Sequence, residues 1–204
     1  MTFTIWLSLF TICILGAMSP GPSLAMVAKH SLAGGRSNGI STAWAHAVGI
    51  AIYAFITLFG LAVMLHQSPL LFKGLSYGGA LYLAYLGFKA LGSKGGVAEK
   101  IELGKAVSIW ESARDGFFIS MLNPKIALFF IALFSQFVAV GDELSSKAII
   151  VLTPFVVDGL WYTFIAFILS SRKLLDKLRS RAVLIDRISG VVLIALAIRV
   201  FIAV

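Results

Sequence analysis

The sequence feature that most constrains the fold is a proline-rich break, Ser19-Pro20-Gly21-Pro22, inside an apolar segment that has no charged residue before Lys29. Proline lacks a backbone N–H and clashes with the preceding turn, so two prolines around a glycine interrupt a helix. At membrane depth the freed backbone groups must be satisfied by protein or water, which places the break against a protein interior or a wet cavity. One proline alone would indicate a kink, but a second break, Asn123-Pro124-Lys125, recurs in the other half of the chain. Two such breaks predict a binding element.

The composition is that of an integral membrane protein. Hydrophobic residues make up 59% of the chain and charged residues 13%, against about 25% charged in soluble proteins, and the mean hydropathy is +0.97. At roughly 20 residues per span, 204 residues accommodate about six helices and no separate soluble domain. We therefore predict an all-α, polytopic membrane protein with one transmembrane domain over residues 1–204, its first and fourth helices broken. The expected spans are about 3–28, 40–65, 71–91, 116–140, 148–171 and 188–204.

The net charge of +8 does not indicate nucleic-acid binding, because the basic residues gather in loops between apolar spans. There they act as topology signals and as contacts to anionic membrane lipid. Lys and Arg concentrate in the first, third and fifth loops, so the positive-inside rule places these loops, including a long one over about 93–112, in the cytoplasm. Both termini are then expected on the external, periplasmic side. The uncharged start, 1–28, has no basic n-region and is too long for a signal peptide, so it is expected to remain as the first helix.

The order of the spans predicts an internal repeat. Each half, about 1–92 and 113–204, holds three spans and opens with a broken one, and an odd number of spans gives two halves of inverted topology. Small residues at four-residue spacing, such as Ala43, Ala47 and Ala51 in the second span, suit close helix packing. They would serve packing within the chain as well as dimerisation, so a homo-oligomer stays open.

Two charged residues fall well inside the predicted spans. Lys125 and Asp158 each lie about 15 Å from a predicted helix end, near the membrane midplane. An intramembrane charge costs about 2.5–3.5 kcal/mol and pairs with a partner or lines a pathway. One interpretation is a structural Lys125–Asp158 ion pair between antiparallel helices. The other is that Asp158 gains and loses a proton during transport, while Lys125 meets an anionic substrate group or regulates that carboxyl.

The polar groups at the two breaks suit a ligand that carries both an ammonium and a carboxylate. Helix N-termini after Pro22 and Pro124 would present free N–H groups to the carboxylate, and freed carbonyls could accept from the ammonium. Hydroxyls and an amide at the breaks add donors and acceptors. The predicted substrate site consists of Ser19, Pro20, Gly21, Pro22, Ser23, Asn123, Pro124 and Lys125, with Asp158 for proton coupling.

Five short motifs follow one another along the chain: Pro20-Gly21-Pro22, Leu122-Asn123-Pro124-Lys125, Leu128-Phe129-Phe130, Phe134-Ser135-Gln136-Phe137 and Val156-Val157-Asp158. In their order and spacing, over essentially the whole chain, they resemble the LysE/RhtB family of bacterial amino-acid exporters. The resemblance implies efflux of amino acids across the bacterial inner membrane, driven by the proton motive force, with the first two motifs and Asp158 at the site.

The chain departs from this family's pattern at two positions. Ser23 follows the first motif where relatives often have Asn or Asp, and Ser135 stands where many have proline. Because Ser23 is small and neutral and would border the pocket, we expect a neutral or modestly polar substrate. The homoserine, threonine and leucine branch of the family therefore fits better than the basic amino-acid branch.

The alternatives to a transporter are an intramembrane enzyme and a non-transporting scaffold. An intramembrane enzyme would need a nucleophile and base, or metal ligands, at membrane depth, and the three histidines, His30, His46 and His66, show no spacing that assembles a site with Asp158. A lone histidine near a helix end is more often a packed or hydrogen-bonded residue than a proton carrier, and a single cysteine, Cys13, allows no thiolate cluster. We therefore predict a non-enzyme without metal or cofactor. A non-transporting scaffold or accessory subunit is the other alternative, in which loss of Asp158 would damage folding but abolish no flux.

Overall fold

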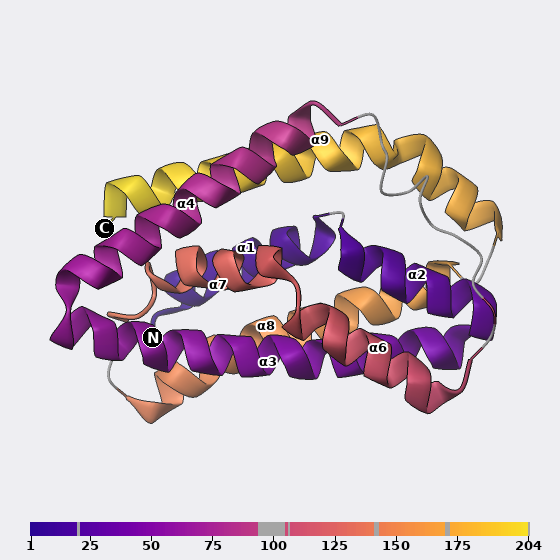
Figure 1. Cartoon of the computed structure of the whole chain (residues 1–204), viewed down its shortest axis with the longest axis horizontal. Helices are drawn as coiled ribbons and strands as arrows, with labels where there is room; N and C mark the ends of the chain where they lie inside the picture. Colours follow the sequence, from indigo (N-terminus) through magenta and orange to yellow (C-terminus); the bar gives the residue numbers. More distant parts are fainter. Residues whose placement is uncertain (20, 94–104, 106, 141–142, 170–171, 204) are drawn as a thin grey trace.

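The computed structural model describes residues 1–19, 21–93, 105, 107–140, 143–169 and 172–203, and for 172–179 the backbone only. In this part of the chain there are eight helices and no strand, which confirms the all-α prediction (Figure 1). The helices are α1 (Phe3–Met18), α2 (Pro22–Gly34), α3 (Arg36–Gln67), α4 (Pro69–Leu91), α6 (Ile109–Met121), α7 (Pro124–Phe134), α8 (Leu144–Leu169) and α9 (Arg172–Ala203).

Both predicted breaks interrupt a helix. The α1 and α2 axes differ by 62°, and those of α6 and α7 by 54°. Pro22 and Pro124 each occupy the first turn of the following helix, where a missing N–H costs nothing and the fixed φ suits a helix start. Asn123 caps α7, because its side-chain oxygen accepts from the Lys125 N–H at 3.1 Å. Pro20, in the first break, lies outside the described residues.

Two helix starts were placed too late. α9 begins at Arg172 rather than near 188, and α6 at Ile109 rather than 116. In both places the charged residues suggest a loop. Lys, Arg and Leu are nevertheless good helix formers, and no proline or glycine interrupts 172–188. Asp186 therefore lies within a helix, not in a basic loop. Of the predicted loop 93–112, residues 94–104 and 106 lie outside the described part, and 109–112 belong to α6.

The helices are long and apolar enough for two to four membrane spans. α3 and α8 each meet the requirement alone, and each bent pair, α1 with α2 and α6 with α7, would count as one further span. Large apolar side chains are exposed on the outer surface, among them Leu70, Leu144 and Ile202 at 84, 77 and 81%. Extensive exposed apolar surface marks a membrane or protein interface. The molecule is thus a multi-pass membrane protein.

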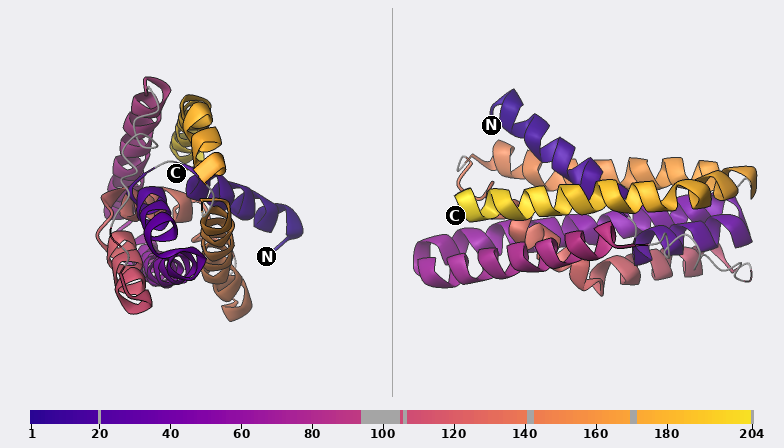
Figure 2. Two further views of the ribbon diagram at one scale, coloured as in Figure 1. Left: turned by 90° about the vertical axis from the view of Figure 1, so that its right-hand side faces the viewer. Right: turned by 90° about the horizontal axis from the view of Figure 1, so that it is seen from above.

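The helices form three layers. α4 and α9 lie side by side on one face, α3 lies with α6 and α8 on the other, and α1, α2 and α7 fill the middle (Figures 1 and 2). The two termini lie at the same end, whereas α3, α6 and α9 begin at the opposite end. The two breaks come together near the middle of the length of the molecule, which is where a central site would form.

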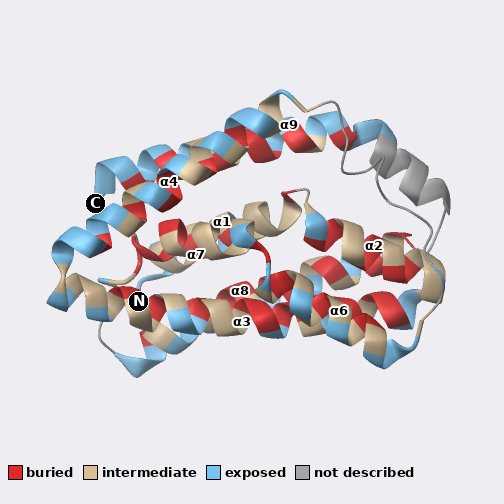
Figure 3. Ribbon diagram, in the orientation of Figure 1, coloured by how far each residue is buried: buried red, intermediate tan, exposed pale blue. Residues whose placement is uncertain are grey.

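The buried side chains gather between the layers (Figure 3). One cluster joins α1, α3, α7 and α8, a second joins α2, α3 and α8, and a third joins α4, α7 and α9. The contact between α3 and α6 is especially close. A Cβ added to Gly116 would lie 2.3 Å from the backbone oxygen of Thr42, so only glycine fits there. These contacts fix α3 against both broken helices and α8 against the first.

Candidate functional site

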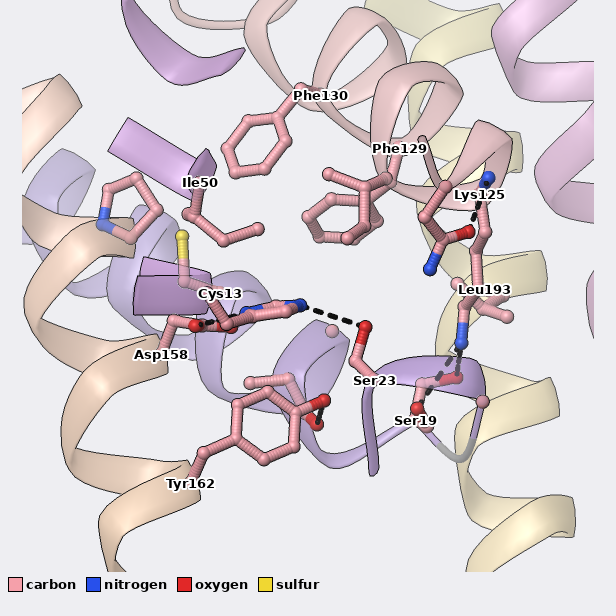
Figure 4. Close-up of a pocket in the computed structure, with 17 residues that line it drawn as sticks. Cys13, Ser19, Ser23, Ile50, Lys125, Phe129, Phe130, Asp158, Tyr162 and Leu193 are labelled. Atoms are coloured by element: carbon pink, nitrogen blue, oxygen red, sulfur yellow. Dashed lines mark hydrogen bonds and ion pairs between the residues drawn. The ribbon is translucent and has the colours of Figure 1, made fainter. Parts of the chain in front are cut away.

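A cavity of about 60 Å³, which we call the inner cavity, lies where the two breaks meet α3 and α8 (Figure 4). At about 10–15 Å³ per water, it has room for a few water molecules. Six of the nine predicted site residues line it: Ser19, Gly21, Ser23, Asn123, Lys125 and Asp158. Pro22 and Pro124 line a second, adjoining cavity, and Pro20 lies outside the described residues.

A continuous hydrogen-bonded chain runs along one wall of the inner cavity. His46 Nδ1 lies 2.7 Å from Asp158 Oδ2, and His46 Nε2 lies 2.8 Å from Ser23 Oγ. The three side chains come from α8, α3 and α2, and all three are buried. An imidazole between a carboxylate and a hydroxyl can bind a proton and pass one along the chain. The protonation state of Asp158 is thereby linked to the first helix break.

The interpretation of Lys125 and Asp158 as a structural ion pair, one of the two that the sequence left open, is wrong. Asp158 pairs with His46 at 2.7 Å, and Lys125 Nζ instead donates to Ser19 Oγ at 2.7 Å and to the Ser19 carbonyl at 3.2 Å. The reason lies in the packing. α7, which carries Lys125, packs on α3 and α4, whereas α8 packs on α1 and α3. Lys125 therefore reaches the first break and joins the two breaks directly.

His46 is a hydrogen-bonded residue, as expected, but the expectation that no histidine joins Asp158 is wrong. His46 contacts Asp158 across 112 positions of sequence, and spacing along one helix cannot reveal such a contact. A signal was present, since an ionisable side chain within an apolar span is a functional candidate by default.

Tyr162 is a further residue of the site that does not belong to the predicted set. Its ring lies edge-on to His46, with centroids 5.2 Å apart. Its hydroxyl donates to the Ala17 carbonyl at 3.3 Å. In an unbroken helix that carbonyl would bond the N–H four residues later, at Gly21. Tyr162 therefore satisfies a backbone group that the break has freed.

A second histidine–aspartate pair lies apart from the cavity and ties helices together. His30 Nε2 lies 3.3 Å from Asp115 Oδ2, and His30 Nδ1 lies 3.0 Å from Ser112 Oγ. Asn38 donates to the same hydroxyl at 2.8 Å. This cluster joins α2, α3 and α6 at the end of the molecule where α3 begins. Among the described residues, no group of three His, Cys, Asp or Glu side chains could hold a metal ion.

The model of the family described as LysE type translocator matches residues 14–203 of the chain. The chain belongs to this family. The resemblance to LysE/RhtB exporters is thereby confirmed.

Several membrane proteins are similar to the chain over long stretches. The uncharacterized membrane protein YrhP of Bacillus subtilis is 26% identical over 204 residues, which cover 95% of this chain and 96% of the relative. The leucine efflux protein of Enterobacter sp. (strain 638) is 29% identical over 150 residues, covering 72% and 71%. That of Salmonella typhimurium is 34% identical over 125 residues, covering 59% and 57%. No solved structure matches the chain.

Proposed function

We propose that the protein is a secondary active exporter that moves neutral amino acids across the bacterial inner membrane in exchange for protons. The observation that carries the proposal is a cavity at the junction of two helix breaks, on whose wall Asp158 is linked to Ser23 through His46. Membership of the LysE translocator family and similarity to proteins named leucine efflux proteins support amino-acid export.

The proposed topology has six spans in one domain over 1–204, with inverted halves of about 1–92 and 113–204. The termini are periplasmic and the loop over about 93–112 is cytoplasmic. The packing supports this arrangement, because exchanging the halves maps one set of contacts onto another. The contacts of α3 with α6 and α7 correspond to those of α8 with α1 and α2, and α3 on α4 corresponds to α8 on α9. The pairs α3–α8 and α4–α9 map onto themselves, as a two-fold repeat requires.

Proton coupling is assigned to the pair of Asp158 and His46. Proton uptake by Asp158 neutralises the carboxylate and weakens its bond to His46, which in turn holds Ser23 at the start of α2. The first break is then free to rearrange when the proton binds. Antiport follows if the protonated and the deprotonated forms of the protein differ in their affinity for the substrate. A ligand shifts a conformational equilibrium only by the difference between its affinities for the two states.

Substrate binding is assigned to the two breaks. The substrate carboxylate meets the Lys125 ammonium and the first N–H groups of α2, while its ammonium meets the oxygens of Ser19 and Asn123. Pro20, Pro22 and Pro124 keep these backbone groups out of helical hydrogen bonds. Gly21 has no side chain and the side chain of Ser23 is small and uncharged, so neither adds a charge to the cavity wall.

The test is flux in proteoliposomes that contain the purified protein and carry an imposed proton gradient. Labelled leucine, threonine, homoserine and lysine form the panel. The expected result is saturable movement of one or more neutral amino acids that follows the gradient, with little movement of lysine. Glu111→Gln, which changes an exposed carboxylate paired with Arg114, is the control and should match the wild type. No flux of any amino acid from folded, inserted protein would contradict the proposal and favour the scaffold alternative.

A second candidate is hydrolysis within the membrane, because Ser23, His46 and Asp158 are linked in the same order as the groups of a serine hydrolase. A fluorophosphonate probe separates the two candidates. A hydrolase would be labelled at Ser23 in the wild type but not in Ser23→Ala. An exporter is expected to remain unlabelled, because this hydroxyl is buried and serves His46 as a hydrogen-bond partner.

A further inference from the structure

A second and larger cavity, which we call the outer cavity, adjoins the inner one. It lies between α4, α9 and the two breaks, and its volume of about 380 Å³ is about six times that of the inner cavity. Lys125 and Ser19 line both cavities, and the 2.7 Å hydrogen bond between them lies at the boundary. A molecule passing from one cavity to the other must displace this contact.

The outer cavity contains a buried carboxylate that the proposed function does not use. Asp186, in the middle of α9, is 5% exposed and accepts a hydrogen bond from the Ser93 hydroxyl. Burying a carboxylate within an apolar bundle is costly, and one hydroxyl fills only part of the capacity of its two oxygens. The other charged side chains on the cavity wall are Lys125 and, at the exposed end of α4, Lys89.

We propose that the outer cavity is a loading site for zwitterionic amino acids, in which Asp186 binds the α-ammonium and Lys125 the α-carboxylate. The inference rests on the proposed export function and adds a site and a residue to it. An amino acid carries its two charges close together, so a wall that offers the carboxylate of Asp186 and the buried end of the Lys125 side chain is complementary to it, whereas Lys89 lies at the exposed end of α4. When the substrate carboxylate binds Lys125, it replaces the oxygens of Ser19 and opens the boundary to the inner cavity.

The experiment compares the wild type, Asp186→Asn and the control Glu111→Gln in proteoliposome flux, with leucine as the transported probe. One hydrogen bond to a charged group corresponds to about 10- to 100-fold in affinity. We therefore expect Asp186→Asn to raise KM for leucine by about that factor, with little change in kcat. Inhibition by N-acetyl-leucine, which lacks the ammonium, should be weak in the wild type and should approach that by leucine in Asp186→Asn. Glu111→Gln should match the wild type in both measurements.

The loading site would be overturned if Asp186→Asn kept the wild-type KM and still discriminated between leucine and N-acetyl-leucine as the wild type does. With normal wild-type flux, that result would leave the export function standing. Absence of wild-type flux for every amino acid would overturn the export function and the loading site together. If Asp186→Asn fails to fold, a measurement that uses only the wild type still tests the proposal. A carbodiimide should modify Asp186, as mapped by mass spectrometry, and saturating leucine should protect it. Equal modification with and without leucine would overturn the proposal.

Discussion

The two helix breaks are alike in sequence, but their backbone groups are satisfied in different ways. At the second break, Asn123 caps its own helix by accepting from the Lys125 N–H. At the first break, the residue before the helix is Gly21, which has no side chain with which to cap it. Both breaks receive a tyrosine hydroxyl from another helix, since Tyr53 of α3 donates to the Met121 carbonyl at 2.7 Å as Tyr162 does to the Ala17 carbonyl. Only the second break also has a side-chain cap of its own, so the first depends more on residues from other helices.

Those residues come from three different helices. Lys125 of α7 donates to Ser19, His46 of α3 contacts Ser23, and Tyr162 of α8 donates to the carbonyl of Ala17. Each contact can be exchanged for a contact with a ligand or released by a change of charge. We infer that the first break is the adjustable element of the site and that the second is a fixed platform that carries Lys125.

The largest effect is expected from His46→Ala, which removes one support of the first break and leaves Asp158 buried without its partner. Breaking a buried pair from one side costs about 3–5 kcal/mol, so we expect a loss of that size in the free energy of unfolding in detergent. Hydrogen exchange should accelerate at the start of α2 more than at the start of α7.

Two further variants sharpen this prediction. His66→Ala, at the exposed end of α3, should change the free energy of unfolding by less than about 0.5 kcal/mol. The double variant His46→Ala/Asp158→Asn should recover part of the loss, because the unpaired charge is removed as well. A double variant no more stable than His46→Ala would show that the two residues do not act as a pair.

Lys125→Gln should have the next largest effect, because it removes the cation that joins the fixed break to the adjustable one. Loss of a hydrogen bond to a charged group predicts a fall of about 10- to 100-fold in kcat/KM for leucine flux. Lys73→Gln, which changes an exposed lysine of α4, is the matched control and should transport normally. Wild-type flux in Lys125→Gln would remove this residue from substrate binding.

Asn123→Ala should have the smallest effect. Loss of a helix cap costs about 1 kcal/mol, which thermal unfolding in detergent can resolve, and Asn123→Ser should restore most of it. KM for leucine is expected to rise by no more than about tenfold, because Ser19 offers the substrate ammonium a second acceptor. A rise of about 100-fold at unchanged stability would instead make the second break a binding element equal to the first.

Much of this site could be predicted from the sequence, because its main elements are local. Pro22 and Pro124 interrupt their helices through the chemistry of proline itself, and Lys125 and Asp158 are conspicuous as charges within apolar spans. The family motifs also follow the chain in order. These features need no knowledge of which helices are neighbours.

The partners of these residues could not be predicted in the same way. Lys125 lies in the second broken span, and Asp158 lies in the unbroken span that follows it. However, α7 packs on α3 and α4, while α8 packs on α1 and α3. Asp158 therefore meets His46, and Lys125 meets Ser19. Asp186 was overlooked because the basic residues before it resembled a loop, although they continue α9.

Asp158 is proposed to couple proton movement to substrate movement, and Asp158→Asn in proteoliposomes tests this role most directly. Two quantities are measured with labelled leucine: accumulation driven by a proton gradient, and exchange of internal for external leucine without a gradient. Asp158→Asn should lose gradient-driven accumulation while exchange persists. Gradient-driven accumulation at the wild-type level in folded Asp158→Asn would contradict it.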